Sequence, residues 1–337
     1  MANWYLETTN EDAVISTRVR IARNISGNPF INKISNENAS HIINIVRDAL
    51  QNTNYGLKVM LLKDMDDITK LSLVEKHIIS PEFAMNKTEI GAIAINDEEN
   101  ICIMINEEDH LRIQVFSAGL NLDSALSLAM EIEESIGKKV NYAYNEKYGF
   151  LTSCPSNVGT GLRTSVMMHL PALTKTRNIE KVLNVVNGFG MNIRGIYGEG
   201  TNSKGNIYQI SNKQTLGITE QETIENIQAI TDRVIEQEKL ARKILTKEAI
   251  ELEDEVYRAY GVITNCRKIS SDECMLLLSK IRLGVNLGII KEITEATLNK
   301  LEIYTKPANL QKRIGQVFTA NQRDIKRAEI IKNIIAE

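Results

Sequence analysis

The sequence predicts an α+β fold, in which an antiparallel sheet flanked by helices is followed by an all-helical C-terminal domain. Short apolar runs rich in β-branched residues, which are typical of strands, recur between residues 14 and 211. Segments with apolar residues at helical spacing separate these runs. Beyond about residue 237 the strand patterns stop and helical spacing continues. We therefore expect two domains, at residues 1–240 and 241–337.

Composition excludes several classes of protein. The 337 residues are 43% hydrophobic, which is sufficient for a large core, and the formal net charge is -3. This near balance gives no overall field that would attract nucleic acid or a membrane surface. The four cysteines lack the paired spacing of a zinc site or a disulfide framework. With no secretory signal and no apolar run of about 18 residues, we expect a cytoplasmic protein with free thiols, no membrane association and no metal site of its own.

The first predicted strand begins at Val14 and carries Arg18 and Arg20. Residues two apart in a strand share one face, with Val19 on the other. Two adjacent guanidinium groups repel each other, and a polyanion bound between them would relieve that repulsion. A solvated basic edge paired with nearby acids is the alternative.

An acidic cluster of Glu107, Glu108 and Asp109 follows the second strand of a predicted hairpin. Three carboxylates at the end of a buried strand are costly unless a cation meets them. One interpretation is a solvated acidic loop. The arginines and glycine-rich segments elsewhere favour another, namely a site for phosphoryl transfer to a cationic acceptor. The elements expected around the cluster are helices at 38–50, 71–79 (with His77 near an end set by Pro81) and 120–136, and strands at 57–62, 91–96 and 101–106.

A loop that starts at Cys154 is predicted to lead into a helix at 164–169. Gly159 and Gly161 would let backbone N–H groups approach an anion at the start of this helix. Beside Arg163 and a helix N-terminus, Cys154 would be a reactive or anion-facing thiol. A buried structural cysteine in a turn is the alternative. The loop is neither a Walker motif nor a dinucleotide fingerprint.

Residues 194–205 form a long glycine-rich loop of the kind that folds over a bound ligand. Thr219 and Glu222 form a capping-box pattern that opens a long helix. The other elements expected in the second half are strands at 150–153, 191–196 and 206–211, and helices at 178–186, 238–260, 272–282 (capped by Ser270 and ended by Gly284), 294–304 and 322–336.

Four motifs, in this order, resemble the catalytic domain of the guanidino (phosphagen) kinases: Ser-Thr-Arg-Val-Arg at 16–20, Asn-Glu-Glu-Asp-His-Leu-Arg at 106–112, Cys-Pro-Ser-Asn-Val-Gly-Thr-Gly-Leu-Arg at 154–163 and Tyr-Gln-Ile-Ser-Asn-Lys at 208–213. Small-molecule members of that family carry a helical domain ahead of these motifs. This sequence has its helices behind them, an arrangement similar to the bacterial protein arginine kinases. The Arg-Asp-Ile-Lys-Arg-Ala segment at 323–328 resembles a motif of that subfamily.

The resemblance implies an ATP-dependent protein-arginine kinase with ATP and Mg²⁺ as cofactors. An arginine guanidinium is protonated at physiological pH, so a carboxylate must fix it and accept its proton as the N–P bond forms. By similarity this base is Glu108, and Glu107 and Asp109 lie nearer to the metal or the acceptor. By the same similarity Cys154 holds the cation as a thiolate. The family's second glutamate is replaced by Asn202 here, and Glu199, three residues earlier, is the nearest carboxylate for that second contact.

The resemblance also implies which residues bind ATP and phosphoarginine. Phosphoryl transfer depends on positioning and on neutralising the phosphate charge, which the family does with arginines, while His77 would pack near the adenine. The implied ATP-binding residues are Ser16, Thr17, Arg18, Val19, Arg20, His77, Arg112, Arg163, Thr164, Ser165, Val166, Met167, Arg194, Gly195, Ile196, Tyr197, Gly198 and Glu199. The implied phosphoarginine-binding residues are Arg323, Asp324, Arg327 and Ala328. An exposed charged helix without a ligand is the alternative for this last group.

Two positions depart from the small-molecule members and leave other functions open. Tyr197 replaces an arginine, and Asn202 replaces a second substrate glutamate. A kinase for free arginine or another small guanidine is one alternative, and an inactive phosphoarginine-binding adaptor is another.

The resemblance further implies partners and a biological setting. The expected partners are protein substrates with exposed arginines, the Clp ATPase and protease system, and an activator protein. The setting would be the stress response, with allosteric regulation. A homodimer is one assembly that the resemblance allows, and no nucleic acid is expected.

Overall fold

The computed structural model describes residues 3–8, 13–51, 53–86, 89–195, 203–247 and 249–337. The chain divides into two compact units. Unit 1 comprises Met1–Trp4, Ser16–Val166 and Ser211–Gln228, and unit 2 comprises Tyr5–Ile15, Met167–Ile210 and Ala229–Glu337. Among the described residues, no helix combines the length and the apolar character that crossing a membrane requires.

One eight-stranded sheet has the strand order β2-β3-β4-β5-β1-β8-β10-β9. Antiparallel pairing joins β2 to β3, β3 to β4, β4 to β5 and β5 to β1, as predicted. A separate small hairpin joins β6 (Tyr144–Asn145) and β7 (Gly149–Phe150). The strands of the large sheet are β1 (Val14–Arg23), β2 (Lys58–Leu61), β3 (Ala92–Ile95), β4 (Ile101–Ile105), β5 (Leu111–Ala118), β8 (Leu162–His169), β9 (Met191–Gly195) and β10 (Ile207–Asn212).

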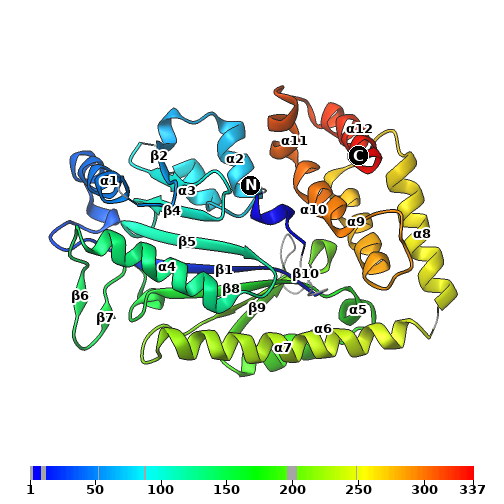
Figure 1. Ribbon diagram of the computed structural model, residues 1–337, viewed down its shortest axis with the longest axis horizontal. Helices are drawn as coiled ribbons and strands as arrows, with labels where there is room; N and C mark the ends of the chain where they lie inside the picture. The colour runs from blue at the N-terminus through cyan, green and yellow to red at the C-terminus, as the bar shows by residue number, and fades with distance from the viewer. Residues whose placement is uncertain (1–2, 9–12, 52, 87–88, 196–202, 248) are drawn as a thin grey trace. The chain divides into compact units, whose positions relative to one another are not determined.

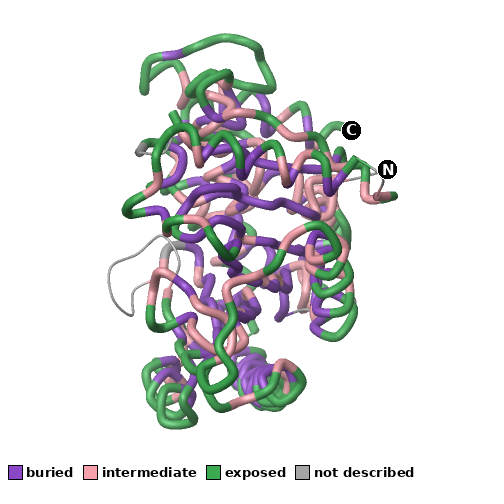
Figure 2. Tube along the Cα trace, turned by 90° about the vertical axis from the view of Figure 1, so that its left-hand side faces the viewer, coloured by how far each residue is buried: buried purple, intermediate pink, exposed green. Residues whose placement is uncertain are grey.

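The strands of unit 1 are accompanied by helices, and local sequence features such as N-caps mark where these helices begin. Ser35 caps α1 by accepting a hydrogen bond from the backbone N–H of Asn38, and α4 runs along β5 (Figure 1). The β4 strand is buried along its whole length, and Figure 2 shows that buried residues alternate with exposed ones along much of the rest of the chain. The helices that lie wholly in unit 1 are α1 (Asn36–Leu50), α2 (Asp67–Glu75), α3 (Pro81–Asn86) and α4 (Leu122–Gly137).

The long helix α7 (Glu220–Leu245) contributes residues to both units and begins at the predicted capping box. Thr219 and Glu222 exchange hydrogen bonds, from the Thr219 N–H to Glu222 Oε2 at 2.8 Å and from the Glu222 N–H to Thr219 Oγ1 at 3.1 Å. After β10 the described residues contain helices and loops, as predicted. The helices that lie wholly in unit 2 are α5 (Pro171–Lys175), α6 (Ile179–Gly188), α8 (Ala249–Asn265), α9 (Ser271–Asn286), α10 (Glu295–Tyr304), α11 (Pro307–Ile314) and α12 (Ala320–Ala336).

Several predicted elements were wrong. Residues 164–169 are not a helix but part of β8, a strand placed between β1 and β10, where it pairs on both sides. The strand predicted at 150–153 ends at Phe150. Pro81 does not end a helix at residue 79: α2 stops at Glu75, and Pro81 occupies the first turn of α3, where its missing N–H costs nothing.

Two further corrections concern the C-terminal helices. The helix predicted at 238–260 is divided between α7, which ends at Leu245, and α8, which begins at Ala249. Gly284 lies inside α9 and does not end it. A Cβ at Gly284 would lie 2.3 Å from Cγ1 of Val256, so this glycine permits the close packing of α8 against α9.

Candidate active site

Three of the predicted phosphate-binding arginines lie on one face of the sheet in unit 1. In the antiparallel pair of β1 and β5, Arg18 is opposite Phe116, Arg20 is opposite Gln114, and Ala22 is opposite Arg112. Directly opposed residues project from the same face, and so do residues two apart. Arg18, Arg20 and Arg112 therefore share a face, and all three are half-buried.

The segment at residues 77–78 lies over this face. Gln114 donates through Nε2 to the carbonyl of Ile78 at 2.7 Å, and Arg18 donates through Nη1 to the carbonyl of His77 at 3.4 Å. His77 has a left-handed backbone, with φ of 62°, just after the end of α2. His77 therefore lies beside Arg18.

The three adjacent carboxylates occupy three different environments. Glu107 is 8% exposed and accepts hydrogen bonds from Arg112 Nη1 and Ser80 Oγ, both at 2.7 Å. Asp109 is 2% exposed, and its Oδ1 accepts from Asn24 Nδ2 and from the backbone N–H of Ser153, both at 2.6 Å. Both are thus held by protein groups.

The Glu108 side chain is exposed and makes no hydrogen bond or ion pair with the described part of the chain. Its backbone N–H donates to Glu107 Oε2 at 3.0 Å, and the same oxygen is 2.7 Å from Arg112 Nη1. Glu108 therefore offers an uncommitted carboxylate beside an ordered arginine.

Cys154 and Arg163 are connected through Ser156. The Cys154 sulfur lies 3.0 Å from Ser156 Oγ, which also accepts a hydrogen bond from Arg163 Nη2 at 3.1 Å. Arg163 Nε donates to Asn157 Oδ1 at 3.2 Å. Because β8 is a strand, the expected helix N-terminus beside Cys154 does not exist, and only a short 3₁₀ turn at Pro155–Asn157 follows the thiol.

Gly159 and Gly161 serve packing within the protein, which corrects the expectation that they admit an anion at a helix start. Their φ values are 111° and 65°. A Cβ at Gly159 would lie 2.2 Å from the carbonyl oxygen of Thr215, and a Cβ at Gly161 would lie 2.6 Å from that of Ala22. Backbone meets backbone at both positions, which only glycine permits.

Other predicted ATP-binding residues are largely buried in strands. Thr17 donates through Oγ1 to the carbonyl of Gly119 at 2.7 Å, and the N–H of Thr164 donates to Asn212 Oδ1 at 2.9 Å. In unit 2, Arg194 is exposed on β9. The remaining described members are buried Ser16, Val19, Ser165 and Val166, and half-buried Met167 and Gly195. Ile196, Tyr197, Gly198, Glu199 and Asn202 lie outside the described residues.

In the C-terminal motif, Arg327 is 1% exposed and makes contacts within unit 2. It donates through Nε to the carbonyl of Thr305 at 2.7 Å, and through Nη1 to the carbonyl of Ile269 at 2.8 Å and to Asp324 Oδ1 at 2.7 Å. Ala328 is also buried. Arg323 is half-buried and donates through Nη1 to the carbonyl of Phe318 at 3.2 Å, so it is the more accessible arginine of the pair.

Arg23 has a structural role that the sequence analysis did not predict. It is an odd number of residues from Arg18 and Arg20 and thus projects from the opposite face of β1. Arg23 is 4% exposed, pairs with Glu133 at 2.8 Å and stacks over the Phe150 ring at 3.4 Å. Burial lowers the pKa of Arg23, opposed by the Glu133 carboxylate. Its role is to join α4 to β1 and β7.

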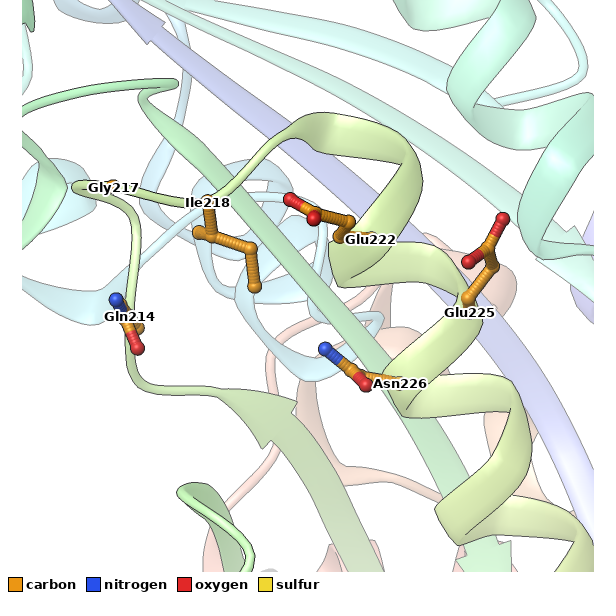
Figure 3. A pocket seen from close by; sticks show the side chains of 6 residues that line it. All are labelled: Gln214, Gly217, Ile218, Glu222, Glu225 and Asn226. Carbon is orange, nitrogen blue, oxygen red and sulfur yellow. The ribbon is translucent and has the colours of Figure 1, made fainter.

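A pocket in unit 1 is separate from every predicted site residue. Its volume is about 360 Å³, and Figure 3 shows side chains from the start of α7 and from the preceding loop around it. Glu222 already accepts hydrogen bonds from Thr219 as part of the helix cap. The lining residues are Gln214, Gly217, Ile218, Glu222, Glu225 and Asn226.

Comparisons with known proteins identify the family of the chain. Residues 40–241 match the family model for the ATP:guanido phosphotransferase C-terminal catalytic domain, and residues 249–337 match the model for the protein-arginine kinase McsB C-terminal domain. The protein-arginine kinase of Clostridium tetani is 42% identical, with 98% of each chain covered. That of Bacillus subtilis is 44% identical, with 98% of this chain and 93% of the relative covered.

Solved structures of a lombricine kinase and a taurocyamine kinase share the fold over 71–72% of this chain. Lombricine kinase has a TM-score of 0.60 at 25% identity, over 72% of this chain and 69% of that one. The substrate-free duplicated taurocyamine kinase of Schistosoma mansoni has a TM-score of 0.59 at 28% identity, over 71% of this chain and 36% of its own length. This chain thus matches about a third of the duplicated protein. The chain belongs to the ATP:guanido phosphotransferases and, among them, to the protein-arginine kinase family.

Proposed function

We propose that this chain transfers the γ-phosphoryl group of ATP to the guanidinium of arginine residues in proteins. Membership of the protein-arginine kinase family supports the reaction and the substrate class. One observation carries the assignment of the base: of three adjacent carboxylates, Glu107 and Asp109 are held by protein groups, and the exposed Glu108 side chain makes no hydrogen bond or ion pair with the described residues.

In this proposal Glu108 performs the proton transfer. A guanidinium nitrogen is a poor nucleophile while the group is protonated. The Glu108 carboxylate accepts a proton from the guanidinium as the nitrogen forms a bond to the γ-phosphorus. The bond from that phosphorus to the β–γ bridging oxygen breaks, and ADP leaves with the electron pair. The products are phosphoarginine, ADP and a proton.

Arginines on one face of unit 1 would neutralise the phosphates. Arg18, Arg20 and Arg112 share that face, and the Glu107 contact at 2.7 Å fixes the Arg112 side chain. We include Arg163 in the same role, oriented by Asn157 at 3.2 Å. Fixed donors cost no reorganisation when the charge moves, which is the main source of catalysis in phosphoryl transfer.

Mg²⁺ is part of the proposal and fits the donors present. Because Glu107 and Asp109 are both occupied by protein groups, the acidic turn offers at most one carboxylate. That suits a Mg²⁺ ion held mainly by phosphate oxygens and water, with few protein ligands. When bound, the ion would neutralise phosphate charge, and the Glu108 carboxylate would stay available for the guanidinium.

Cys154 would hold the guanidinium in place beside the base. Its sulfur is half-buried and 3.0 Å from the Ser156 hydroxyl, which can donate to a thiolate. We also propose that Glu199 makes the second carboxylate contact to the guanidinium and that residues 194–199 bind ATP.

The wider setting is proposed on family membership. We include Clp-dependent protein turnover, an activator protein, a homodimer and a cytoplasmic location. Arg323, Asp324, Arg327 and Ala328 are proposed as a phosphoarginine-binding site, in which Arg323 is the more accessible arginine. The division into a catalytic domain at 1–240 and a helical domain at 241–337 also stays a prediction.

The test compares substrates directly. The purified chain is incubated with ATP and Mg²⁺, and with either an arginine-rich protein or free L-arginine, and phosphoarginine is measured by mass spectrometry without acid. We expect phosphorylated protein and little free phosphoarginine. Turnover on the free amino acid alone would make the chain a small-guanidine kinase. Absence of turnover on both substrates, with retained binding of phosphorylated protein, would make it an adaptor.

A further inference from the structure

Asn24, the residue after β1, joins two loops through its side-chain amide. It is 1% exposed. Its Nδ2 donates to Asp109 Oδ1 at 2.6 Å and to the carbonyl of Leu151 at 3.1 Å. Its Oδ1 accepts from the backbone N–H of His110 at 2.9 Å. One amide thus connects the end of β1 to the acidic turn and to the loop ahead of Cys154.

Asp109 completes the connection. The oxygen that accepts from Asn24 also accepts from the backbone N–H of Ser153 at 2.6 Å. Asp109 is 2% exposed, so both bonds are shielded from water. Glu108 is the residue before Asp109, and Cys154 is the residue after Ser153. The bonds therefore act on the immediate neighbours of the proposed base and the proposed thiolate.

We propose that Asn24 is a positioning residue that fixes the spacing between the Glu108 turn and the Cys154 loop. This proposal rests on the function proposed above, in which Glu108 and Cys154 hold the same guanidinium. Groups that must grip one planar cation from two loops need a defined separation, and small displacements reduce the rate strongly. Asn24 enforces that separation without touching the substrate.

An asparagine amide suits this position chemically. It donates two hydrogen bonds and accepts another within one planar group. Aspartate would keep the acceptor for His110 but place a second carboxylate 2.6 Å from Asp109 Oδ1, where two negative charges repel. Alanine would leave buried partners on both loops unpaired.

Cysteine alkylation provides a test that does not depend on activity. Asn24→Ala and Asn24→Asp are treated with iodoacetamide, and the reaction rate of each cysteine is followed by mass spectrometry. Cys102 and Cys274 are buried and report on the fold, whereas Cys154 is half-buried and reports on its loop. Asn28→Ala is the matched control, because Asn28 bonds within its own turn, to the carbonyl of Ser26 at 3.3 Å.

We expect the Cys154 rate in both variants to rise about tenfold, while Cys102 and Cys274 stay protected. The kcat for protein phosphorylation should fall about a hundredfold with little change in KM for ATP. If Cys102 and Cys274 react along with Cys154 in Asn24→Ala, that variant has lost its fold. The Asn24→Asp variant then provides the test, because aspartate preserves the side-chain volume and the contact to His110. A wild-type Cys154 rate in Asn24→Asp would overturn the proposal. If alkylation changes as expected but wild-type protein phosphorylates no arginine, the proposed function fails while the positioning of the two loops stands.

Discussion

At the scale of single residues, three adjacent carboxylates have different hydrogen-bond partners and different exposure. The sequence identified Glu107, Glu108 and Asp109 as one acidic cluster. Their order along the chain could not show which of them is held by other protein groups. The difference comes from their hydrogen-bond partners: Ser80 and the nearby Arg112 hold Glu107, and Asn24, which is distant in sequence, holds Asp109. Long-range pairing of this kind is a property of the folded sheet, so it could not be read from local pattern.

Removing the charge of Glu107 should weaken nucleotide use without removing the base. In Glu107→Gln the side chain can still accept from Ser80, but the charged contact that fixes Arg112 is lost. We expect KM for ATP to rise about tenfold with a smaller change in kcat, since charge-assisted hydrogen bonds of this type are the strong ones. Steady-state kinetics against ATP would measure it.

Glu302→Gln is the matched control for this variant. It breaks a similarly buried pair, with Arg282 in unit 2, at 3.1 Å. A KM for ATP that moves equally in both variants would show a general effect of lost ion pairs, and the assignment of Arg112 to the phosphates would lose its support.

At the scale of elements, the strands with strong alternation or continuous apolar runs were predicted correctly, and β8 was not. Thr164 and Val166 favour strands, but the preceding Gly-rich loop resembled an anion-binding helix start. The structure pairs β8 on both sides, which is a tertiary property. The capping box at Thr219 was predicted correctly because all its atoms lie within four residues.

The end of β8 gives a prediction about pH and stability. His169 is 2% exposed, its Nε2 lies 2.8 Å from Ser279 Oγ, and burial, with Arg282 and Arg242, lowers its pKa well below 6.5. The folded state keeps this histidine neutral, whereas the unfolded state takes up a proton below about pH 6.5. The free energy of unfolding should therefore fall as the pH decreases below that value, by up to about 1.4 kcal/mol per pH unit from this group.

Chemical denaturation of His169→Gln across pH 5 to 7.5 would measure this contribution, and we expect a shallower slope than in the wild type. Some slope should remain, because burial also lowers the pKa of His110. A slope in His169→Gln identical to that of the wild type would mean that the folded state does not keep His169 neutral.

At the scale of the whole molecule, the two units show how much the sequence could establish. The α+β class, the helical C-terminal part and the family were predicted from motif order and spacing. The boundary between the two compact units could not be predicted from the sequence, because β1, β8, β10 and α7 each contribute residues to both units. The burial of Arg327 could not be predicted from the sequence either, because its carbonyl partners at Ile269 and Thr305 come from other segments of unit 2.

The C-terminal motif should divide into a structural arginine and an accessible one. Arg327→Ala removes three hydrogen bonds from a buried guanidinium and should lower the free energy of unfolding by about 3 kcal/mol. Arg323→Ala should cost roughly 0.5 kcal/mol or less, because surface substitutions are mild. Denaturant titration of both variants measures the difference. Equal losses would show that Arg323 is as important for folding as Arg327.

The proton transfer assigned to Glu108 is tested most directly by single-turnover kinetics of Glu108→Gln at saturating ATP and protein substrate. Glutamine keeps the shape and the surface position but cannot accept the proton, so the rate should fall by about a hundredfold to ten-thousandfold while ATP affinity stays unchanged. Glu131→Gln, on the exposed face of α4, should react at the wild-type rate. A Glu108→Gln protein that phosphorylates arginine as fast as the wild type would show that another group takes the proton.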